Sequence, residues 1–414
     1  MLESCNRQLT LPSPAQKEKL LAVLNHLNMH NEYYRGVFKE NSINLKGSID
    51  EILEKLPVTT KKDIRKNYSS YISDTREDTF GELTSGSTGT PVNCQKTRTE
   101  RMLAMLNIWK QRRMWDPEVD ITNYLSLHDV NTYKKVGNLL NFEKEHMKKC
   151  FRRLLALSPR WLSGPASTFE KYAKLIQNEE VPYNKGTIKF IELAGEYADK
   201  NSRQYIEEIF GCKTINHYGT IETWCIAYEC PKGHLHVQKD LMYVETVNHS
   251  ILPGKKDIGE ITVTSLYNKL MPVIRYNIQD LGKVEFVDCE CGQASQVITL
   301  YGGRTGDMIV GKKEVLGEIF FKRGIYKLIN RGMDCIDSFR VEQVELNTFI
   351  MYIVRLPNYT DEVTQFLLDY IHTGIGSEAE VEFKFVEDIP PLPSGKIKIF
   401  YSFVKAGEGD AIKR

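Results

Sequence analysis

The chain has 414 residues, more than one small core needs, so we expect a large domain and a smaller one. Lys and Arg total 55 against 54 for Asp and Glu, and a formal charge of +1 gives no global field to attract nucleic acid or an anionic membrane. The N-terminus lacks a signal-peptide pattern, and no apolar run is long enough to span a bilayer. We therefore expect a cytoplasmic protein with no nucleic-acid or membrane partner.

The first part of the chain is predicted to be helical. Apolar residues recur at helical spacing from about residue 14 to residue 53, which indicates amphipathic helices. LPVTTKKDIRKNY then indicates a further helix start, with Thr59 or Thr60 as its cap. In FGELTSGSTGTPVNCQKT, small hydroxylated residues and glycines lie between two segments of strand character.

The rest of the chain predicts layered α/β structure. Residues 97–180 alternate helical patterns with short apolar runs, and residues 186–220 repeat a strand, turn, helix, strand order. Beyond Tyr228, short runs rich in Val, Ile and Thr predict a β-rich subdomain. We predict an α/β fold in which residues 1–303 form a multi-layer domain with parallel-type sheets. Residues 304–414 would form a small α+β domain.

The segment from Thr84 to Pro91, TSGSTGTP, is the candidate phosphate loop. Glycines let the backbone approach a polyphosphate, and hydroxyl and amide groups donate hydrogen bonds to its oxygens. The Walker pattern GxxxxGK[ST] is absent. Taken alone, such a loop is as often an ordinary exposed turn.

Five motifs in order resemble those of the adenylate-forming superfamily, which includes acyl-CoA synthetases and the adenylation domains of peptide synthetases. They are TSGSTGTPV, HYGTIET at 217–223, RYNIQD at 275–280, GGRTGD at 302–307 and PLPSGKIK at 391–398. Within the superfamily, the closest resemblance is to the phenylacetate-CoA ligase branch with its CapK-type proteins. Two departures are Gln279, where the family usually has Gly, and the altered segment after Asp307.

The resemblance implies a nucleotide site. Tyr218 would face adenine, Asp280 would hold both ribose hydroxyls, Arg304 would contact phosphate or ribose, and Glu222 would hold Mg²⁺. Lys396 would place its charge on the α-phosphate and the substrate carboxylate, so Lys396, Glu222 and Arg304 are the predicted catalytic residues. The predicted nucleotide contacts are Thr84, Ser85, Gly86, Ser87, Thr88, Gly89, Gly195, Glu196, Tyr218, Gly219, Thr220, Asp280 and Arg304. Each also has an ordinary interpretation as a surface, turn or core residue.

The acyl pocket and the hinge are predicted from the same resemblance. The neighbours of the adenine segments, and so the candidate pocket residues, are Tyr124, His128, Ala194, His217 and Trp224. Asp307 lies at the expected domain junction, where the C-terminal domain of this superfamily rotates as a lid between adenylation and thioester formation.

A cysteine-rich group predicts a structural zinc site. Nine cysteines are scattered along the chain, and most should be reduced. Cys230, His236, Cys289 and Cys291 form a set suited to tetrahedral zinc, with His234 competing for the fourth place. Some members of the resembled branch carry this layout. Unligated cysteines are the alternative.

The predicted function is that of an AMP-forming acid–thiol ligase. It would activate an aryl or small hydrophobic carboxylic acid with ATP and Mg²⁺, release pyrophosphate, and transfer the acyl group to coenzyme A or a carrier-protein phosphopantetheine. The rival hypothesis is a catalytically silent nucleotide-binding homologue in a polysaccharide or natural-product gene cluster. The sequence leaves a homodimer open.

Overall fold

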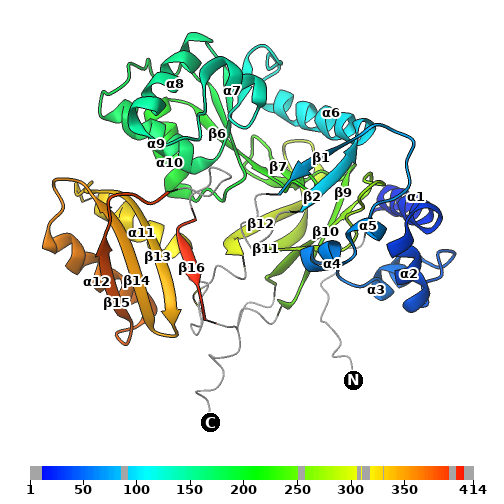
Figure 1. Ribbon diagram of the computed structural model, residues 1–414. Helices are drawn as coiled ribbons and strands as arrows, with labels where there is room; N and C mark the ends of the chain where they lie inside the picture. The colour runs from blue at the N-terminus through cyan, green and yellow to red at the C-terminus, as the bar shows by residue number, and fades with distance from the viewer. Residues whose placement is uncertain are drawn as a thin grey trace.

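The computed structural model describes residues 12–84, 92–249, 257–304, 309, 318–329, 331–390 and 398–404. Short helices form the N-terminal part: α1 (Pro14–His30), α2 (Glu32–Glu40), α3 (Ile49–Lys55), α4 (Lys61–Lys66) and α5 (Tyr68–Tyr71). They pack at one end of the molecule (Figure 1). Thr60 caps the start of helix α4. Its hydroxyl accepts from the backbone N–H of Asp63, and the Asp63 carboxylate accepts from the backbone N–H of Thr60.

A hairpin brackets the candidate phosphate loop. Strands β1 (Thr79–Leu83) and β2 (Asn93–Thr97) pair antiparallel, and beyond them the backbone N–H of Thr84 donates to the carbonyl of Val92 at 2.9 Å. The base of the loop is therefore fixed by strand pairing. Helix α6 (Arg98–Trp115) follows directly, because Thr97 and Glu100 form a capping box.

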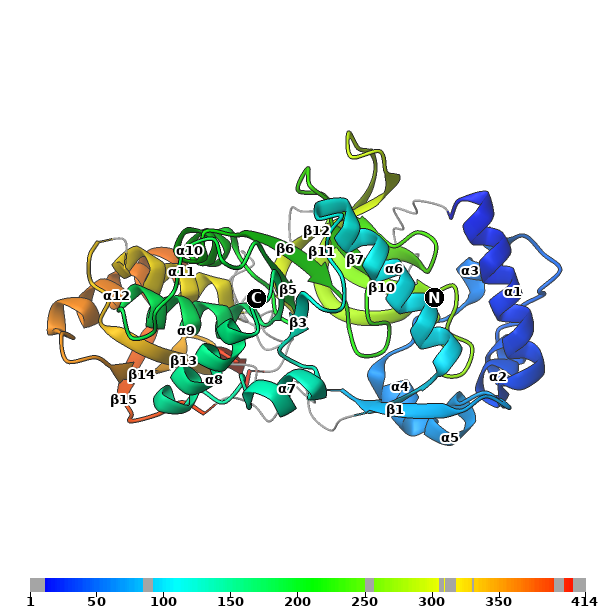
Figure 2. The ribbon, with the colours of Figure 1, turned by 90° about the horizontal axis from the view of Figure 1, so that it is seen from above.

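A ten-stranded sheet forms the centre of the molecule, in the order β3-β4-β5-β6-β7-β8-β12-β11-β10-β9. Its first four strands are parallel: β3 (Tyr124–Ser126), β4 (Trp161–Gly164), β5 (Phe190–Ala194) and β6 (Lys213–Tyr218). Four helices accompany them, α7 (Val130–Val136), α8 (Lys144–Ala156), α9 (Ala166–Gln177) and α10 (Lys200–Phe210), and share one apolar core with β3, β4 and β5 (Figure 2).

From β6 onward the sheet is antiparallel. Its strands are β7 (Ala227–Glu229), β8 (Leu235–Val237), β9 (Met242–Val247), β10 (Gly259–Ser265), β11 (Tyr276–Asp288) and β12 (Ala294–Arg304). Many of their side chains are buried, because this half packs against the N-terminal helices in a second core. Strand β6 thus borders both halves, and its C-terminal end lies where the pairing changes from parallel to antiparallel.

A separate four-stranded sheet, in the order β15-β14-β13-β16, forms the C-terminal unit. Its elements are α11 (Glu318–Ile329), β13 (Ile336–Glu345), β14 (Thr348–Arg355), α12 (Asp361–Ile375), β15 (Glu380–Phe385) and β16 (Phe400–Ser402). They enclose a core of their own. The predicted α/β fold class with a small C-terminal α+β unit is confirmed, while the boundary at residue 303/304 stays a prediction.

Within the described part of the chain, no helix combines the length and the apolar character needed to cross a membrane.

Candidate active site

Two of the predicted nucleotide-binding segments meet at the end of β6. The hydroxyl of Tyr218 donates to a carboxylate oxygen of Asp280 at 2.8 Å, so the predicted adenine-facing and ribose-binding side chains touch. Strand register places the backbone of Arg304 opposite Asp280. Just before Asp280, Gln279 has φ +70°, a conformation that glycine adopts without steric cost. The backbone therefore explains why Gly is usual at this position in the resembled family.

The turn after Tyr218 is tightly wound. A Cβ atom on Gly219 would lie 1.5 Å from the carbonyl oxygen of Trp224, so only glycine fits there. Trp224 itself has φ +58°, and its backbone N–H donates to the carbonyl of Thr220 at 2.6 Å. This turn, residues 219–224, carries Glu222 in a fixed orientation.

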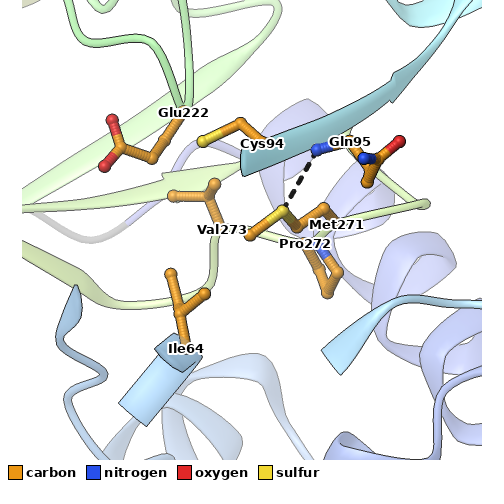
Figure 3. Close-up of a pocket in the computed structure, with 7 residues that line it drawn as sticks. All are labelled: Ile64, Cys94, Gln95, Glu222, Met271, Pro272 and Val273. Carbon is orange, nitrogen blue, oxygen red and sulfur yellow. Dashed lines mark hydrogen bonds between the residues drawn. The ribbon is translucent and has the colours of Figure 1, made fainter. Parts of the chain in front are cut away.

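Glu222 lies beside a small pocket between β2 and the segment before β11. Figure 3 shows Cys94, Val273 and Ile64 around the space next to it, with Gln95, Met271 and Pro272 on the other side. The hydroxyl of Tyr276 donates to Glu222 Oε1 at 2.9 Å. Burial and the nearby Glu222 carboxylate raise the pKa of Tyr276. The carboxylate is therefore held at the rim of a partly apolar recess, where its oxygens are suited to a hard cation.

The hairpin brings cations to the same region. Lys61, from the start of α4, donates to the hydroxyl of Thr84 at 2.8 Å at the base of the candidate phosphate loop. Lys96, from β2, donates to the backbone carbonyls of Ile221 and Glu222 at 2.5 Å and 3.2 Å. Neither lysine was predicted as a site residue, although each lies next to a predicted segment.

The predicted residues Gly195 and Glu196 follow β5. Gly195 has φ +88° and turns the chain away from the sheet. The Glu196 carboxylate accepts from the backbone N–H and the hydroxyl of Ser167, both at 3.0 Å. It thereby caps α9, whose N-cap residue Pro165 offers no side-chain acceptor.

A buried ion pair, which was not predicted from the sequence, contacts two of the predicted pocket residues, Tyr124 and His217. Glu192 on β5 is 1% exposed and accepts from Arg112 Nε at 2.7 Å and Nη2 at 2.9 Å. The hydroxyls of Tyr228 and Ser163 donate to the same carboxylate at 2.7 Å and 3.1 Å. Although burial raises the pKa of Glu192, Arg112 and His217 hold it well below its usual range. The Glu192 carboxylate thus has several donors, as a buried charge requires, whereas Arg112 Nη1 is buried without a hydrogen-bond partner among the described residues.

His217 connects this ion pair to the nucleotide segments. Its Nδ1 lies 3.0 Å from Glu192 Oε1, and it pairs in register with Ala194 of the neighbouring strand. Burial lowers the pKa of His217, but contacts with Cys225 and Glu192 raise it to about 10. Tyr124 approaches the same carboxylate at 3.4 Å. Ala194 and His217 thus lie side by side at the ends of β5 and β6, whereas Tyr124 reaches the Glu192 carboxylate from the start of β3.

The other two predicted pocket residues lie elsewhere. The indole of Trp224 donates to Glu82 at 2.7 Å and packs beneath Lys96, against the hairpin. His128 is exposed after β3, where its backbone N–H donates to the Ser126 hydroxyl. The contact of Trp224 with the hairpin could not be predicted from local patterns, because Glu82 lies 142 positions away in the chain.

The cysteine-rich segments, in the turns between β7 and β8 and between β11 and β12, come together. One candidate ligand atom from each of Cys230, His234, His236 and Cys289 lies within 4.8 Å of all the others. Cys291 Sγ lies 3.5 Å from His236 Nε2. His236 Nδ1 is 2.8 Å from the Ser295 hydroxyl, which leaves Nε2 for a ligand, as is usual for metal-binding histidines.

This cluster offers five candidate donors, so the choice between His234 and His236 stays open on position alone. His234 Nδ1 lies 3.1 Å from Cys289 Sγ. The backbone N–H of Cys291 helps to lower the pKa of the Cys289 thiol to about 7, which favours the thiolate that zinc binds. The donor types and their convergence fit a structural zinc ion.

Several predicted site residues lie outside the described residues. They are Ser85, Gly86, Ser87, Thr88, Gly89, Asp307 and Lys396, and of Arg304 only the backbone is described.

The fold is similar to that of the adenylate-forming acyl-CoA ligases. The crystal structure of 2-hydroxyisobutyryl-CoA ligase in its postadenylation state aligns with a TM-score of 0.73 at 15% identity, covering 94% of this chain and 90% of the other. Residues 317–402 match the family model of the CapK C-terminal domain.

Two curated relatives extend the comparison. Protein CapK of Staphylococcus aureus is 23% identical over 98% of this chain and 91% of its own length. Phenylacetate-coenzyme A ligase of Thermus thermophilus is 23% identical over 71% of each chain. The predicted resemblance is confirmed: the chain is a homologue of CapK and of phenylacetate-CoA ligase, with the fold of adenylate-forming enzymes.

Proposed function

We propose that this protein activates a small carboxylic acid as an acyl-adenylate and then transfers the acyl group to a thiol. The observation that carries the proposal is the contact of Tyr218 with Asp280 beside Glu222, at the junction of the sheet. It joins two motifs that are 62 residues apart, as a nucleotide site requires. The similarity to acyl-CoA ligases over nearly the whole chain supports the same activity.

In the proposed first step, a carboxylate oxygen of the acid bonds to the α-phosphorus of ATP, and the bond from that phosphorus to pyrophosphate breaks. Asp280 would hold the ribose hydroxyls and Tyr218 the adenine. Lys396 and Arg304 would offset the negative charge that gathers on the phosphate oxygens. In the second step a thiol sulfur attacks the acyl carbon, and AMP leaves.

Glu222 would hold a magnesium ion, which when bound supplies positive charge to the polyphosphate. The fit rests on the carboxylate's place at the rim of the recess in Figure 3 and on its anchoring by Tyr276. Thr84 with Lys61 would support the adjoining phosphate loop. A zinc ion held by Cys230, Cys289, Cys291 and His236, or by His234 in place of His236, would have a structural role in joining two β-segments.

We propose an acyl pocket next to Glu192, with Ala194 and His217 at the ends of β5 and β6 and with Tyr124 approaching from the start of β3. An aryl or small hydrophobic acid would suit it, and the similar ligase that handles a 2-hydroxyisobutyryl group supports the smaller end of this range. The acceptor thiol is coenzyme A or a carrier-protein phosphopantetheine. Asp307 would be the hinge for the C-terminal unit.

The test is carboxylate-dependent release of pyrophosphate and AMP over a panel of aryl, aliphatic and 2-hydroxy acids. Coenzyme A and a phosphopantetheine carrier protein are supplied in separate arms. Lys396→Ala should lower the rate by about 10² to 10³. Glu222→Gln should raise the magnesium requirement, whereas Glu362→Gln on the exposed face of α12 should change nothing.

Other outcomes would count against the proposal. Formation of ADP instead of AMP would contradict adenylation. Folded protein that binds ATP but releases no pyrophosphate with any acid would favour the catalytically silent homologue.

A further inference from the structure

Lys96 is a buried cation on the strand that leaves the candidate phosphate loop. Its side chain is 1% exposed. Burying an ammonium group is costly unless polar partners replace its water shell. Burial lowers the pKa of Lys96, and the carboxylate of Glu82 opposes this effect. The partners of the Lys96 ammonium therefore indicate the role of this side chain.

Those contacts lie on the turn that carries Glu222. Nζ donates to the carbonyl oxygens of Ile221 and Glu222 at 2.5 Å and 3.2 Å, and it lies 3.8 Å from the ring centroid of Trp224. Glu82 Oε2 is 4.0 Å from Nζ and accepts from the Trp224 indole at 2.7 Å. Two carbonyls and an aromatic face form a cation site, and the ammonium occupies it.

The backbone of the turn explains why it needs a cation. The left-handed Trp224 and the close approach at Gly219 wind residues 219–224 so tightly that the carbonyls of Ile221 and Glu222 point inward together. Buried carbonyls without donors would destabilise this conformation. Lys96 supplies the donors from β2, and Glu82 supplies the balancing charge from β1.

The two strands of the hairpin flank residues 85–91. Glu82 lies on β1 and pairs in register with Cys94, and Lys96 lies further along β2, where it pairs with Phe80. The lysine and Glu82 therefore join both strands of the hairpin to the turn that carries Glu222.

We infer that Lys96 is a positioning residue, whose ammonium fixes the main chain of the turn that carries Glu222 against strands β1 and β2, so that the carboxylate is preorganised for magnesium-bound ATP. This inference rests on the proposed role of Glu222. Lys96 acts through the turn and does not touch the nucleotide.

The experiment measures binding of ATP by calorimetry over a series of magnesium concentrations, without any acid present. Lys96→Met keeps the length and packing of the side chain but removes the charge. It should weaken magnesium-dependent ATP binding about tenfold or more while leaving magnesium-free binding nearly unchanged. Lys96→Ala should lose as much, and added methylammonium should restore part of it by filling the same site. Lys110→Met, exposed on α6, is the control and should behave as the unmodified protein.

A second variant keeps the inference testable if both Lys96 variants fail to fold. Glu82→Gln removes the balancing charge and should weaken magnesium-dependent binding in the same direction by a smaller factor. The inference is overturned if folded Lys96→Met shows the magnesium dependence of the unmodified protein, or if Glu222→Gln loses that dependence and Lys96→Met and Glu82→Gln do not. If the unmodified protein binds ATP without regard to magnesium, the proposed function fails first.

Discussion

The backbone at Gly219 lies in close contact with the backbone at Trp224. An alanine there would force the Trp224 carbonyl away, because its Cβ would lie 1.5 Å from that oxygen. We expect Gly219→Ala to lower the free energy of unfolding by about 2 kcal/mol or more. Urea denaturation measures the change.

Gly36 provides the matched control for this substitution. It lies within α2, and a Cβ atom there meets nothing within 4 Å. Gly36→Ala should raise stability by up to about 1 kcal/mol, since alanine is the better helix former. Equal effects of the two substitutions would refute the steric argument.

His217 provides a second prediction at the scale of single residues. Its folded-state pKa is raised to about 10 from 6.5, so it contributes stability that is fully present below about pH 6.5 and is lost as the pH rises through about 10. The stability difference between the unmodified protein and His217→Gln should therefore shrink over that range. Denaturant titrations at a series of pH values measure it. A difference that stays constant with pH would mean that His217 is neutral when folded.

Single residues of the site were predictable only where a motif carried them. Tyr218 and Asp280 belong to recognised motifs, and the structure joins them. Lys96, Glu192 and Arg112 were missed, because Lys96 finds its partners 125 and 126 positions away and Arg112 finds its partner 80 away. No local spacing marks such residues, and in the sequence they look like ordinary polar side chains.

At the scale of elements, the order of strands is the part that sequence patterns do not contain. The strand, turn, helix repeats predict the parallel half, because each helix returns the chain to the same edge. The antiparallel half was predicted only as short strands. Its neighbours β8 and β12 are separated by β9, β10 and β11 in the chain, and pairing of Val297 with His236 needs the full tertiary structure.

The cysteine cluster lies next to the pairing of β8 with β12. It joins the β7–β8 turn to the β11–β12 turn, next to the short β8–β12 contact. If zinc is bound, Cys289→Ser should remove it and speed amide hydrogen exchange in β8 and β12, because metal binding contributes directly to folding. Elemental analysis and exchange mass spectrometry measure the two effects.

Cys212→Ser is the control for that experiment, since Cys212 is a buried thiol of the other core, away from the cluster. It should keep the zinc content of the unmodified protein. If protein purified without chelator holds no zinc, the proposed metal site is wrong and the cluster is a set of ordinary thiol and imidazole groups.

At the scale of the whole molecule, the C-terminal unit rests on α9 and α10 of the large sheet domain (Figure 1). The hydroxyl of Tyr326, on α11, donates to Glu170 at 2.6 Å and lies 2.9 Å from the Ser202 hydroxyl. Lys174 Nζ lies 3.2 Å from Asp334 and donates to the Ile336 carbonyl. These polar contacts, which can break and reform in water, suit a surface that must separate if the unit rotates.

Tyr326→Phe tests this interface. The substitution keeps the ring but removes the donor to Glu170, whose pKa burial already raises. Removing this donor from the half-buried Glu170 carboxylate costs about 1 kcal/mol, so the packed arrangement should become less populated. We expect faster hydrogen exchange on α9 and a larger radius of gyration by small-angle scattering. If the proposed reaction holds, the ratio of thioester formation to adenylation should rise.

Tyr352→Phe separates loosening of the interface from loss of folding. Its hydroxyl also donates to a glutamate, Glu342 at 3.2 Å, but both residues lie within the C-terminal sheet. It should change neither α9 exchange nor the radius of gyration. If the two variants behave alike, the Tyr326 contact does not hold the units together, and the arrangement would depend on the ion pair of Lys174 or on the chain segment that joins them.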